Sequence, residues 1–219
     1  GQSYVAYLFA HDDQSFGTNS DEAIIKCGSY SSTGFVDLGF EPQWVIIKST
    51  SDTNPYRGDW RMFDNMRGII EGDDNQLFAN ESRAEDTGSF ATVLKLDPTG
   101  FTVESQGDYG TSTIYMAIRR PHKPPSAATE VFMPVKTTTQ PFSVGFPTDL
   151  GINKPTGTGS VYWVPRLTNG YLASNATNQE SDGRTYFKFD LQNNYTLSNF
   201  WGSNETINWQ FRRAPGFMD

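Results

Sequence analysis

Residues 39–48 read Gly-Phe-Glu-Pro-Gln-Trp-Val-Ile-Ile-Lys, and the same plan returns at residues 145–154 as Gly-Phe-Pro-Thr-Asp-Leu-Gly-Ile-Asn-Lys. Further segments recur in the same order: residues 77–85 return at 172–180, residues 100–101 at 194–195, and residues 117–121 at 210–215. A fixed order of landmarks at a period of about 95 to 105 residues indicates two copies of one domain-sized unit. A residue kept in both copies is therefore a candidate for the scaffold, whereas a residue found in one copy is freer to serve a site.

The composition favours an all-β fold. The 219 residues include 16 Phe, 10 Tyr and 5 Trp, and bulky side chains pack well on pleated sheets. Short apolar runs alternate with turn signals such as Asp97-Pro98-Thr99-Gly100, where Pro and Gly fit a tight hairpin. This pattern predicts two tandem antiparallel β-sandwich units.

The boundaries follow from prolines and from the repeat. Residues 121–125 read Pro-His-Lys-Pro-Pro and cannot continue a sheet interior, because proline withholds ladder donors. We expect a first sandwich repeat over residues 27–125 and a second over residues 126–219. Residues 1–26 are predicted to hold the closing strand of a preceding unit, at residues 4–9, followed by a loop. On this interpretation the full-length protein extends upstream of Gly1.

Charge and cysteine content exclude several classes of partner. A net charge of -8 and a pI near 4.7 argue against a phosphate-binding surface, so we expect no nucleic-acid partner. No apolar run approaches the roughly 20 residues of a membrane span, so no membrane insertion is expected. The single cysteine, Cys27, allows no internal disulfide, and oligomerisation is the expected source of added stability.

The sequence offers no catalytic constellation. The only two histidines, His11 and His122, lie in predicted loops, and no nucleophile elbow, zinc motif or phosphate loop is present. Carboxylates at residues 12–13, 21–22 and 71–75 lack the spacing of a calcium loop and are interpreted as solvated turns. We therefore expect no enzyme activity, no catalytic residue, no metal and no cofactor.

Two groups of side chains are candidates for contacts. The arginine pairs that close the copies could each place one guanidinium on the carboxylates of an adjoining subunit, or could form local ion pairs. These are Arg119, Arg120, Arg212 and Arg213. Aromatic residues present in one copy only could contact a glycan or fill a subunit interface, with core packing as the alternative. These are Tyr56, Trp60 and Trp201.

The chain resembles a repeated β domain of tailed-phage structural proteins. Four motifs match: Gly-Phe-x-Pro-x-Trp-Val at residues 39–45, Trp-x-x-Phe-Asp-x-x-Arg-Gly at 60–68, Leu-x-x-Asn-x-Ser-x-x-Glu at 77–85, and Tyr-x-Ala at 115–117. The second copy departs from the pattern, since Pro165, Thr168 and Asn169 replace Asp64, Arg67 and Gly68. The resemblance implies small concanavalin-type jelly rolls and a location in the virion, after assembly in the host cytoplasm.

From this resemblance we expect a bacteriophage virion structural protein, such as a tail fibre or a capsid decoration protein. It would act by self-assembly and surface presentation, as a homo-oligomer with other virion proteins as partners. A carbohydrate-binding module for host attachment is the first alternative, and it requires exposed aromatics along one groove that contacts a host surface glycan. A surface-glycan depolymerase is the second, and it requires paired carboxylates in a cleft.

Overall fold

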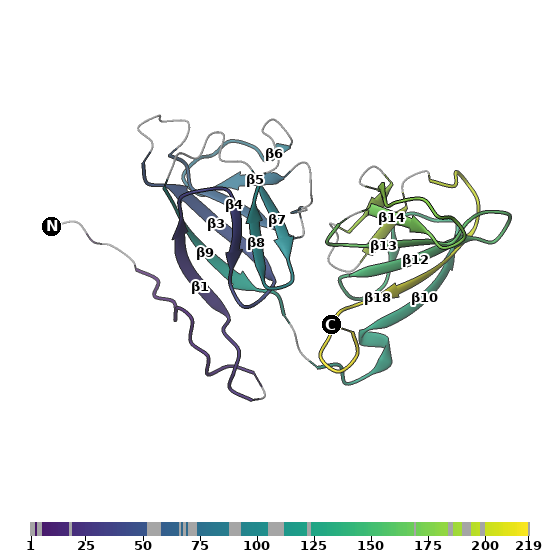
Figure 1. The fold of residues 1–219 in the computed structure, drawn as a ribbon, viewed down its shortest axis with the longest axis horizontal. Helices are drawn as coiled ribbons and strands as arrows, with labels where there is room; N and C mark the ends of the chain where they lie inside the picture. The colour runs from purple at the N-terminus through teal and green to yellow at the C-terminus, as the bar shows by residue number, and fades with distance from the viewer. Residues whose placement is uncertain are drawn as a thin grey trace. The chain divides into compact units, whose positions relative to one another are not determined.

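The computed structural model describes residues 3, 6–17, 19–51, 58–65, 67, 69, 74–87, 93–104, 112–121, 124–168, 170–183, 186–189, 194–197 and 200–218. The chain divides into two compact units, described separately below (Figure 1). Unit 1 comprises Gly1–Asp64 and Asp73–Arg120, and unit 2 comprises Asn65–Gly72 and Pro121–Asp219. Within the described part of the chain, no helix has the length and apolar character that crossing a membrane requires.

Unit 1 contains a six-stranded and a three-stranded sheet, both antiparallel. The six-stranded sheet has the order β1 (Ile25–Tyr30), β9 (Thr113–Arg119), β3 (Pro42–Ser49), β4 (Arg61–Asp64), β5 (Asn75–Phe78) and β6 (Asp86–Thr87). The three-stranded sheet has the order β2 (Gly34–Asp37), β8 (Gly100–Val103) and β7 (Leu94–Asp97). The turn predicted at residues 97–100 is confirmed, because Asp97 pairs with Gly100 across the β7–β8 hairpin.

Unit 2 repeats this topology strand for strand. Its six-stranded sheet has the order β10 (Phe132–Thr137), β18 (Thr206–Phe211), β12 (Leu150–Pro155), β13 (Tyr162–Pro165), β14 (Gly170–Ala173) and β15 (Ser181–Asp182). Its three-stranded sheet has the order β11 (Phe142–Ser143), β17 (Asn194–Leu197) and β16 (Phe187–Lys188). A short 3₁₀ helix, η1 (Ala128–Glu130), precedes β10. The prediction of an all-β chain with two tandem antiparallel sandwich units is confirmed.

The repeat extends to the pairing register. Trp44 of β3 lies opposite Ile118 of β9, and the corresponding Leu150 of β12 lies opposite Phe211 of β18. The turn before β3 and the turn before β12 also have similar glycine conformations. Gly39 and Gly145 have φ values of 74° and 84°. A positive φ is costly for residues other than glycine, so both copies keep glycine at this turn.

The core of each unit lies between its two sheets. In unit 1, Val45 and Phe63 of the large sheet and Phe101 of the small sheet are fully buried. In unit 2, Phe187 and Tyr195 are fully buried at the centre of the main apolar cluster. Side chains alternate between the two faces of a strand, so the residues that flank these positions lie on the outer faces of the sheets.

One predicted strand is not formed. Residues 6–10 belong to no strand, whereas a strand was expected over residues 4–9, of which 4 and 5 lie outside the described residues. The apolar pattern of this segment suits a strand, but a strand also needs a partner for its backbone groups. In the described residues β1 pairs with β9 alone, so this segment does not pair with the free edge of β1.

Candidate functional site

The outer face of each six-stranded sheet carries a row of apolar side chains. In β3, Val45 and Ile47 are buried in the core, while Trp44 and Ile46 point to the opposite face and are half-buried. An antiparallel sheet with one solvated face normally alternates apolar residues inside with polar residues outside. Here both faces of the strand are apolar, which is unusual for a sheet that meets water.

In unit 1 an apolar row crosses five neighbouring strands. Cys27 of β1 pairs with Met116 of β9, Met116 with Ile46 of β3, Ile46 with Met62 of β4, and Met62 with Leu77 of β5. Four of these side chains are half-buried and Cys27 is exposed. We call these five residues the outer row of unit 1. The neighbouring row on the same face consists of Ile25, Ile118, Trp44 and Asp64.

Unit 2 has the same row, with tryptophan in place of methionine at two positions. Pro134 of β10 pairs with Trp209 of β18, Trp209 with Ile152 of β12, Ile152 with Trp163 of β13, and Trp163 with Leu172 of β14. Trp163 and Leu172 are 44% and 43% exposed. We call these five residues the outer row of unit 2. Every position of one outer row has its counterpart in the other, so the apolar character of the face is common to both units.

The size of these faces can be compared with known interfaces. Six strands spaced about 4.8 Å apart, with about 3.3 Å per residue along each strand, give a face on the order of 500 Å². A specific protein–protein interface buries roughly 800 Å² per partner, and contiguous apolar patches of this kind mark interaction sites. One face alone has the area of a small interface, and the two faces of one chain together have the area of a standard one.

The first arginine pair forms ion pairs inside unit 1. Arg119 Nη2 lies 3.6 Å from Glu22 Oε1, and Arg119 Nη1 donates to the carbonyl of Ala23 at 3.5 Å. Arg120 is buried, with Nη1 3.6 Å from Glu41 Oε2. Of the two alternatives predicted for this pair, the structure places both guanidinium groups in local ion pairs.

The second arginine pair lies beside an ion pair that the sequence analysis missed. Asp149 and Arg166 are both buried, and Asp149 Oδ1 accepts from Arg166 Nε at 3.0 Å and lies 2.9 Å from Nη2. The other oxygen, Oδ2, accepts the backbone N–H of Arg213 at 2.6 Å. The backbone N–H of Arg212 donates to the carbonyl of Val131, and Arg212 Nε is buried without a hydrogen-bond partner among the described residues.

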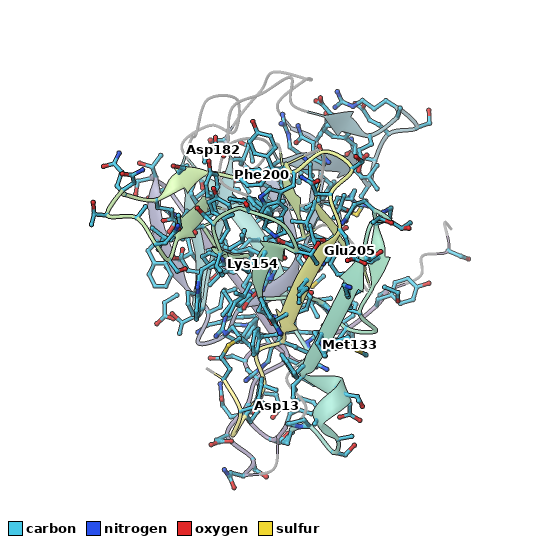
Figure 2. The ribbon with its side chains drawn as sticks, turned by 90° about the vertical axis from the view of Figure 1, so that its right-hand side faces the viewer. Asp13, Met133, Lys154, Asp182, Phe200 and Glu205 are labelled. Atoms are coloured by element: carbon cyan, nitrogen blue, oxygen red, sulfur yellow. The ribbon has the colours of Figure 1, made fainter. Side chains whose placement is uncertain are left out.

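The predicted aromatic contacts lie in different settings. Tyr56 lies outside the described residues. Trp60 is 37% exposed, and the Nζ of Lys48 lies 5.5 Å from its ring centroid. Trp201 is half-buried in an aromatic cluster of unit 2, with its ring 4.9 Å from that of Phe200 (labelled in Figure 2) and 5.6 Å from that of Tyr162. Trp60 belongs to unit 1 and Trp201 to unit 2.

Asn80, which lies in a segment that both copies keep, has a structural role in unit 1. Asn80 Oδ1 accepts the backbone N–H of Trp60 at 2.8 Å, and Asn80 Nδ2 donates to Asp59 Oδ1 at 2.9 Å. Asp59 is buried and also pairs with Arg83, whose guanidinium lies 3.4 Å from the Phe78 ring centroid. This network ties the chain just before β4 to the chain just after β5, and both carboxylate oxygens of Asp59 are engaged in it.

The predicted loop groups have local partners. The Nδ1 of His11 accepts the backbone N–H of Cys27 at 3.0 Å. Asp13 accepts the backbone N–H of Ser15, and hydrogen bonds from Ser15 lower the pKa of this carboxyl below its usual value. Among the residues that the structure describes, no three His, Cys, Asp or Glu side chains gather closely enough to hold a metal ion. His122 and residues 71–73 lie outside the described residues.

The residues that form the outer rows were largely missed by sequence reasoning. Trp163 lies in the run Val161-Tyr162-Trp163-Val164, which is apolar on both faces. An uninterrupted apolar run in an antiparallel strand is the signal that could have predicted an apolar outer face.

Comparison with known proteins identifies one family. A family model described as "Domain of unknown function (DUF7483)" matches residues 1–121. These residues include all of unit 1, whereas the strands of unit 2 lie beyond the match. No curated protein and no solved structure matches the chain. Because the match spans more than half of the 219 residues, the chain belongs to the DUF7483 family, a family defined by a domain of unknown function.

Proposed function

We propose that this chain is a non-catalytic structural protein of a virion that assembles with further copies of itself through the outer faces of its six-stranded sheets. The observation that carries the proposal is the pair of outer rows, one in each unit. Both rows place apolar side chains where an antiparallel sheet usually meets water. Burial of these side chains against another subunit removes their apolar surface from water, which favours association.

The size of the faces supports assembly through both units together. Two single faces in contact bury on the order of 1,000 Å² in total, which is the lower limit for a specific interface. Contacts through both faces of a chain bury about twice that area. Linked contacts also reinforce one another, because the second contact forms at a high effective concentration. We therefore expect a closed or repeating assembly in which both units take part.

The virion location rests on the resemblance of residues 39–45, 60–68, 77–85 and 115–117 to a repeated β domain of tailed-phage structural proteins. A building block of a fibre or of a particle surface needs a rigid fold and faces that contact other subunits. Two sandwich units with apolar outer faces fit that requirement. Other virion proteins are proposed as further partners on the same grounds.

Carbohydrate binding is a second candidate function, and one observation favours it. Trp209 and Trp163 both belong to the outer row of unit 2 and lie two strands apart, which is about 10 Å. Two aromatic side chains on one flat face can stack on successive sugar rings of a glycan. On this alternative the face of unit 2 binds a host surface glycan, and the chain does not need to self-associate through it.

The test is the solution mass of the chain by light scattering over a dilution series from tens of micromolar to nanomolar. Wild type is compared with Trp163→Glu, which places a charge in the outer row of unit 2. Thr158→Glu adds the same charge at an exposed position outside every strand and is the matched control. The same three proteins are then applied to an array of bacterial surface glycans.

The proposal predicts an oligomer for wild type and for Thr158→Glu. For Trp163→Glu it predicts that the concentration needed for assembly rises by about tenfold or more, which is a loss of about 1.4 kcal/mol. A wild-type chain that stays monomeric over the whole series contradicts the proposal. If that monomer retains specific glycans and loses them in Trp163→Glu, the carbohydrate-binding alternative replaces it.

A further inference from the structure

The outer rows of the two units differ in a way that fits them to each other. The second and fourth positions hold Met116 and Met62 in unit 1, and Trp209 and Trp163 in unit 2. Methionine is flexible, and its sulfur makes favourable contacts with aromatic rings. The indole of tryptophan is large and rigid and keeps its shape in a contact. The methionine row of unit 1 is therefore suited to pack around the tryptophan row of unit 2.

A lysine on the outer face of unit 2 has no partner of its own. Lys154 of β12 (labelled in Figure 2) is half-buried two residues from Ile152, on the same face. Among the described residues its ammonium group forms no hydrogen bond or ion pair. Its counterpart in unit 1, Lys48, donates to the carbonyl of Gly58 and lies over the Trp60 ring. Covering Lys154 with another subunit is costly unless that subunit supplies a carboxylate or an aromatic face.

Unit 1 carries both of these groups at one place on its outer face. Asp64 of β4 lies opposite Trp44 of β3, and both side chains are half-buried in the row next to the outer row. The ring of tryptophan attracts a lysine ammonium group above its face, and a carboxylate forms a charge-assisted hydrogen bond with such a group. The counterparts in unit 2 are Pro165 and Leu150, which offer neither contact.

The acidic groups of unit 2 are placed less well for this lysine. Glu205 already pairs with Lys136, with 2.9 Å between Oε2 and Nζ. Asp182 lies on β15, the edge strand of the sheet, three strands from β12. Strands β18, β12 and β13 at the centre of the described sheet hold no acidic residue. A second copy of the unit 2 face is therefore a poorer partner for Lys154 than the unit 1 face.

One arrangement makes all of these contacts together. Two sheets that pack face to face keep their strand directions within about 30° of each other. Turned over onto the unit 2 face with corresponding strands antiparallel, the unit 1 face sets its outer row on that of unit 2. Each methionine then meets the tryptophan at its own position in the row. The rows beside the outer rows change sides, so Trp44 lies over Lys154, and Asp64 lies one strand away, about 5 Å.

We infer that the outer face of unit 1 binds the outer face of unit 2 of a second copy, with the Lys154 ammonium group of one copy against Trp44 and Asp64 of the other. This inference rests on the proposed function, because it assumes assembly through these faces, and it adds which face meets which. Each chain then uses its two faces on two different neighbours. A contact between unlike faces repeats head to tail and produces a ring or a filament.

The test uses one variant for each face. Met62→Glu places a charge in the outer row of unit 1, and Trp163→Glu places one in the outer row of unit 2. Each full-length variant is measured alone and in an equal mixture, by light scattering for mass and by native mass spectrometry, with one variant isotope-labelled, for composition. Urea unfolding checks that each variant is folded, and Leu77→Glu or Leu172→Glu replaces one that is not.

Neither variant alone should assemble at concentrations about tenfold above those at which wild type does, because every contact between unlike faces then includes a substituted face. The mixture should form a dimer with one chain of each kind. In that dimer Met62→Glu contributes an intact unit 2 face and Trp163→Glu an intact unit 1 face. The dimer should not grow further, because its two remaining faces are both substituted.

The other outcomes separate this inference from the proposed function. If each variant alone still forms a dimer, like faces bind each other, which overturns the inference and leaves the proposed function standing. Assembly lost in one variant but not in the other shows that a single face is used, with the same consequence. Two monomeric variants whose mixture also stays monomeric overturn the inference as well. A wild-type chain that is monomeric contradicts the inference and the proposed function together.

The place of Lys154 in the contact is tested by an exchange of charges. Lys154→Glu should raise the concentration needed for assembly by about tenfold, while the control Thr158→Glu should leave it unchanged. Adding Asp64→Lys to the Lys154→Glu chain should restore part of the loss, because the pair between copies is then reversed. Asp64→Asn, which removes only the repulsion, replaces Asp64→Lys if that chain does not fold. No loss, or a loss that neither addition restores, overturns the contact between Lys154 and Asp64.

Discussion

Single buried charges set the strongest local constraints in this molecule. The carboxylate of Asp149 holds Arg166 and the backbone N–H of Arg213, so it ties the start of β12 to the ends of β13 and β18. The sequence predicted an arginine pair at this place but not its partner. The ion pair between Asp149 and Arg166 depends on how three strands lie together, and the residue pattern along any one of these strands does not reveal that arrangement.

Asp149→Ala should destabilise unit 2 by about 3–5 kcal/mol, because it removes the buried carboxylate that pairs with the buried guanidinium of Arg166. The measurement is urea unfolding followed by tryptophan fluorescence. Glu205→Ala is the control: it removes the exposed pair with Lys136, which has a distance of 2.9 Å and side chains 60% and 39% exposed. That change should cost less than about 1 kcal/mol. Equal losses in the two variants would show that the buried pair has no special role.

Tyrosine ionisation should make the stability of unit 1 depend on alkaline pH. Burial raises the pKa of Tyr30 from its ordinary value of 10.0 to about 12. Between these values the unfolded chain releases the phenolic proton and the folded chain keeps it, so the free energy of unfolding falls as pH rises from 10 to about 12. This contribution is fully present below pH 10 and amounts to about 2–3 kcal/mol.

Tyr30→Phe should therefore flatten the loss of stability over this pH range, as measured by unfolding at a series of pH values. Tyr7→Phe is the control, since Tyr7 is 81% exposed. A Tyr30→Phe protein that loses stability as steeply as wild type and Tyr7→Phe would contradict this assignment.

At the scale of the element, β18 differs most from what its sequence suggests. Its apolar residues Ile207 and Trp209 face outward, and Asn208 and Gln210 are fully buried against the small sheet. Residues 206–211 alternate between polar and apolar side chains and form this strand. The pattern did not indicate which face is inside, because the usual rule of apolar residues facing the core gives the wrong answer here. The register of β18 against β12 fixes which face of β18 lies inside, and that register depends on the tertiary structure.

The buried residues of β18 belong to a polar network that unit 1 lacks. Gln210 Nε2 donates to Asn153 Oδ1 at 3.2 Å, and Asn153 Nδ2 donates to the hydroxyl of Tyr195 at 3.2 Å. In unit 1 the corresponding positions of Asn153 and Gln210 are Ile47 and Ala117, both fully buried and apolar. Burial raises the pKa of Tyr195, which keeps its hydroxyl protonated at all ordinary pH values.

Asn153→Ile copies unit 1 but should destabilise unit 2 by about 1–3 kcal/mol, because the buried groups of Tyr195 and Gln210 lose their partner. The double variant Asn153→Ile with Tyr195→Phe should recover part of that loss, since it removes one of the unsatisfied groups. The measurement is a double-mutant cycle by urea unfolding. Additive losses in the double variant would contradict a coupled network.

At the scale of the whole molecule, the tandem repeat was predictable and the use of its surfaces was not. Landmarks at matching positions, such as residues 39–48 and 145–154, predicted two units. The two units have the same strand order. The outer rows were missed because each row takes one residue from each of five strands, which are far apart in sequence. Only the registers of the described strands reveal that Trp209, Ile152 and Trp163 lie side by side.

Assembly through these faces is the central claim, and the only cysteine of the chain provides a direct reporter for it. Cys27 is exposed and belongs to the outer row of unit 1, and burial by the fold already raises the pKa of its thiol. The measurement is the rate at which a thiol reagent labels Cys27 at one fixed pH, across the same dilution series used for light scattering. The account predicts that labelling slows by about tenfold or more at concentrations where the mass shows an oligomer, because the row becomes covered. A labelling rate that stays constant while the oligomer forms would contradict it and would place the contact between copies on another surface.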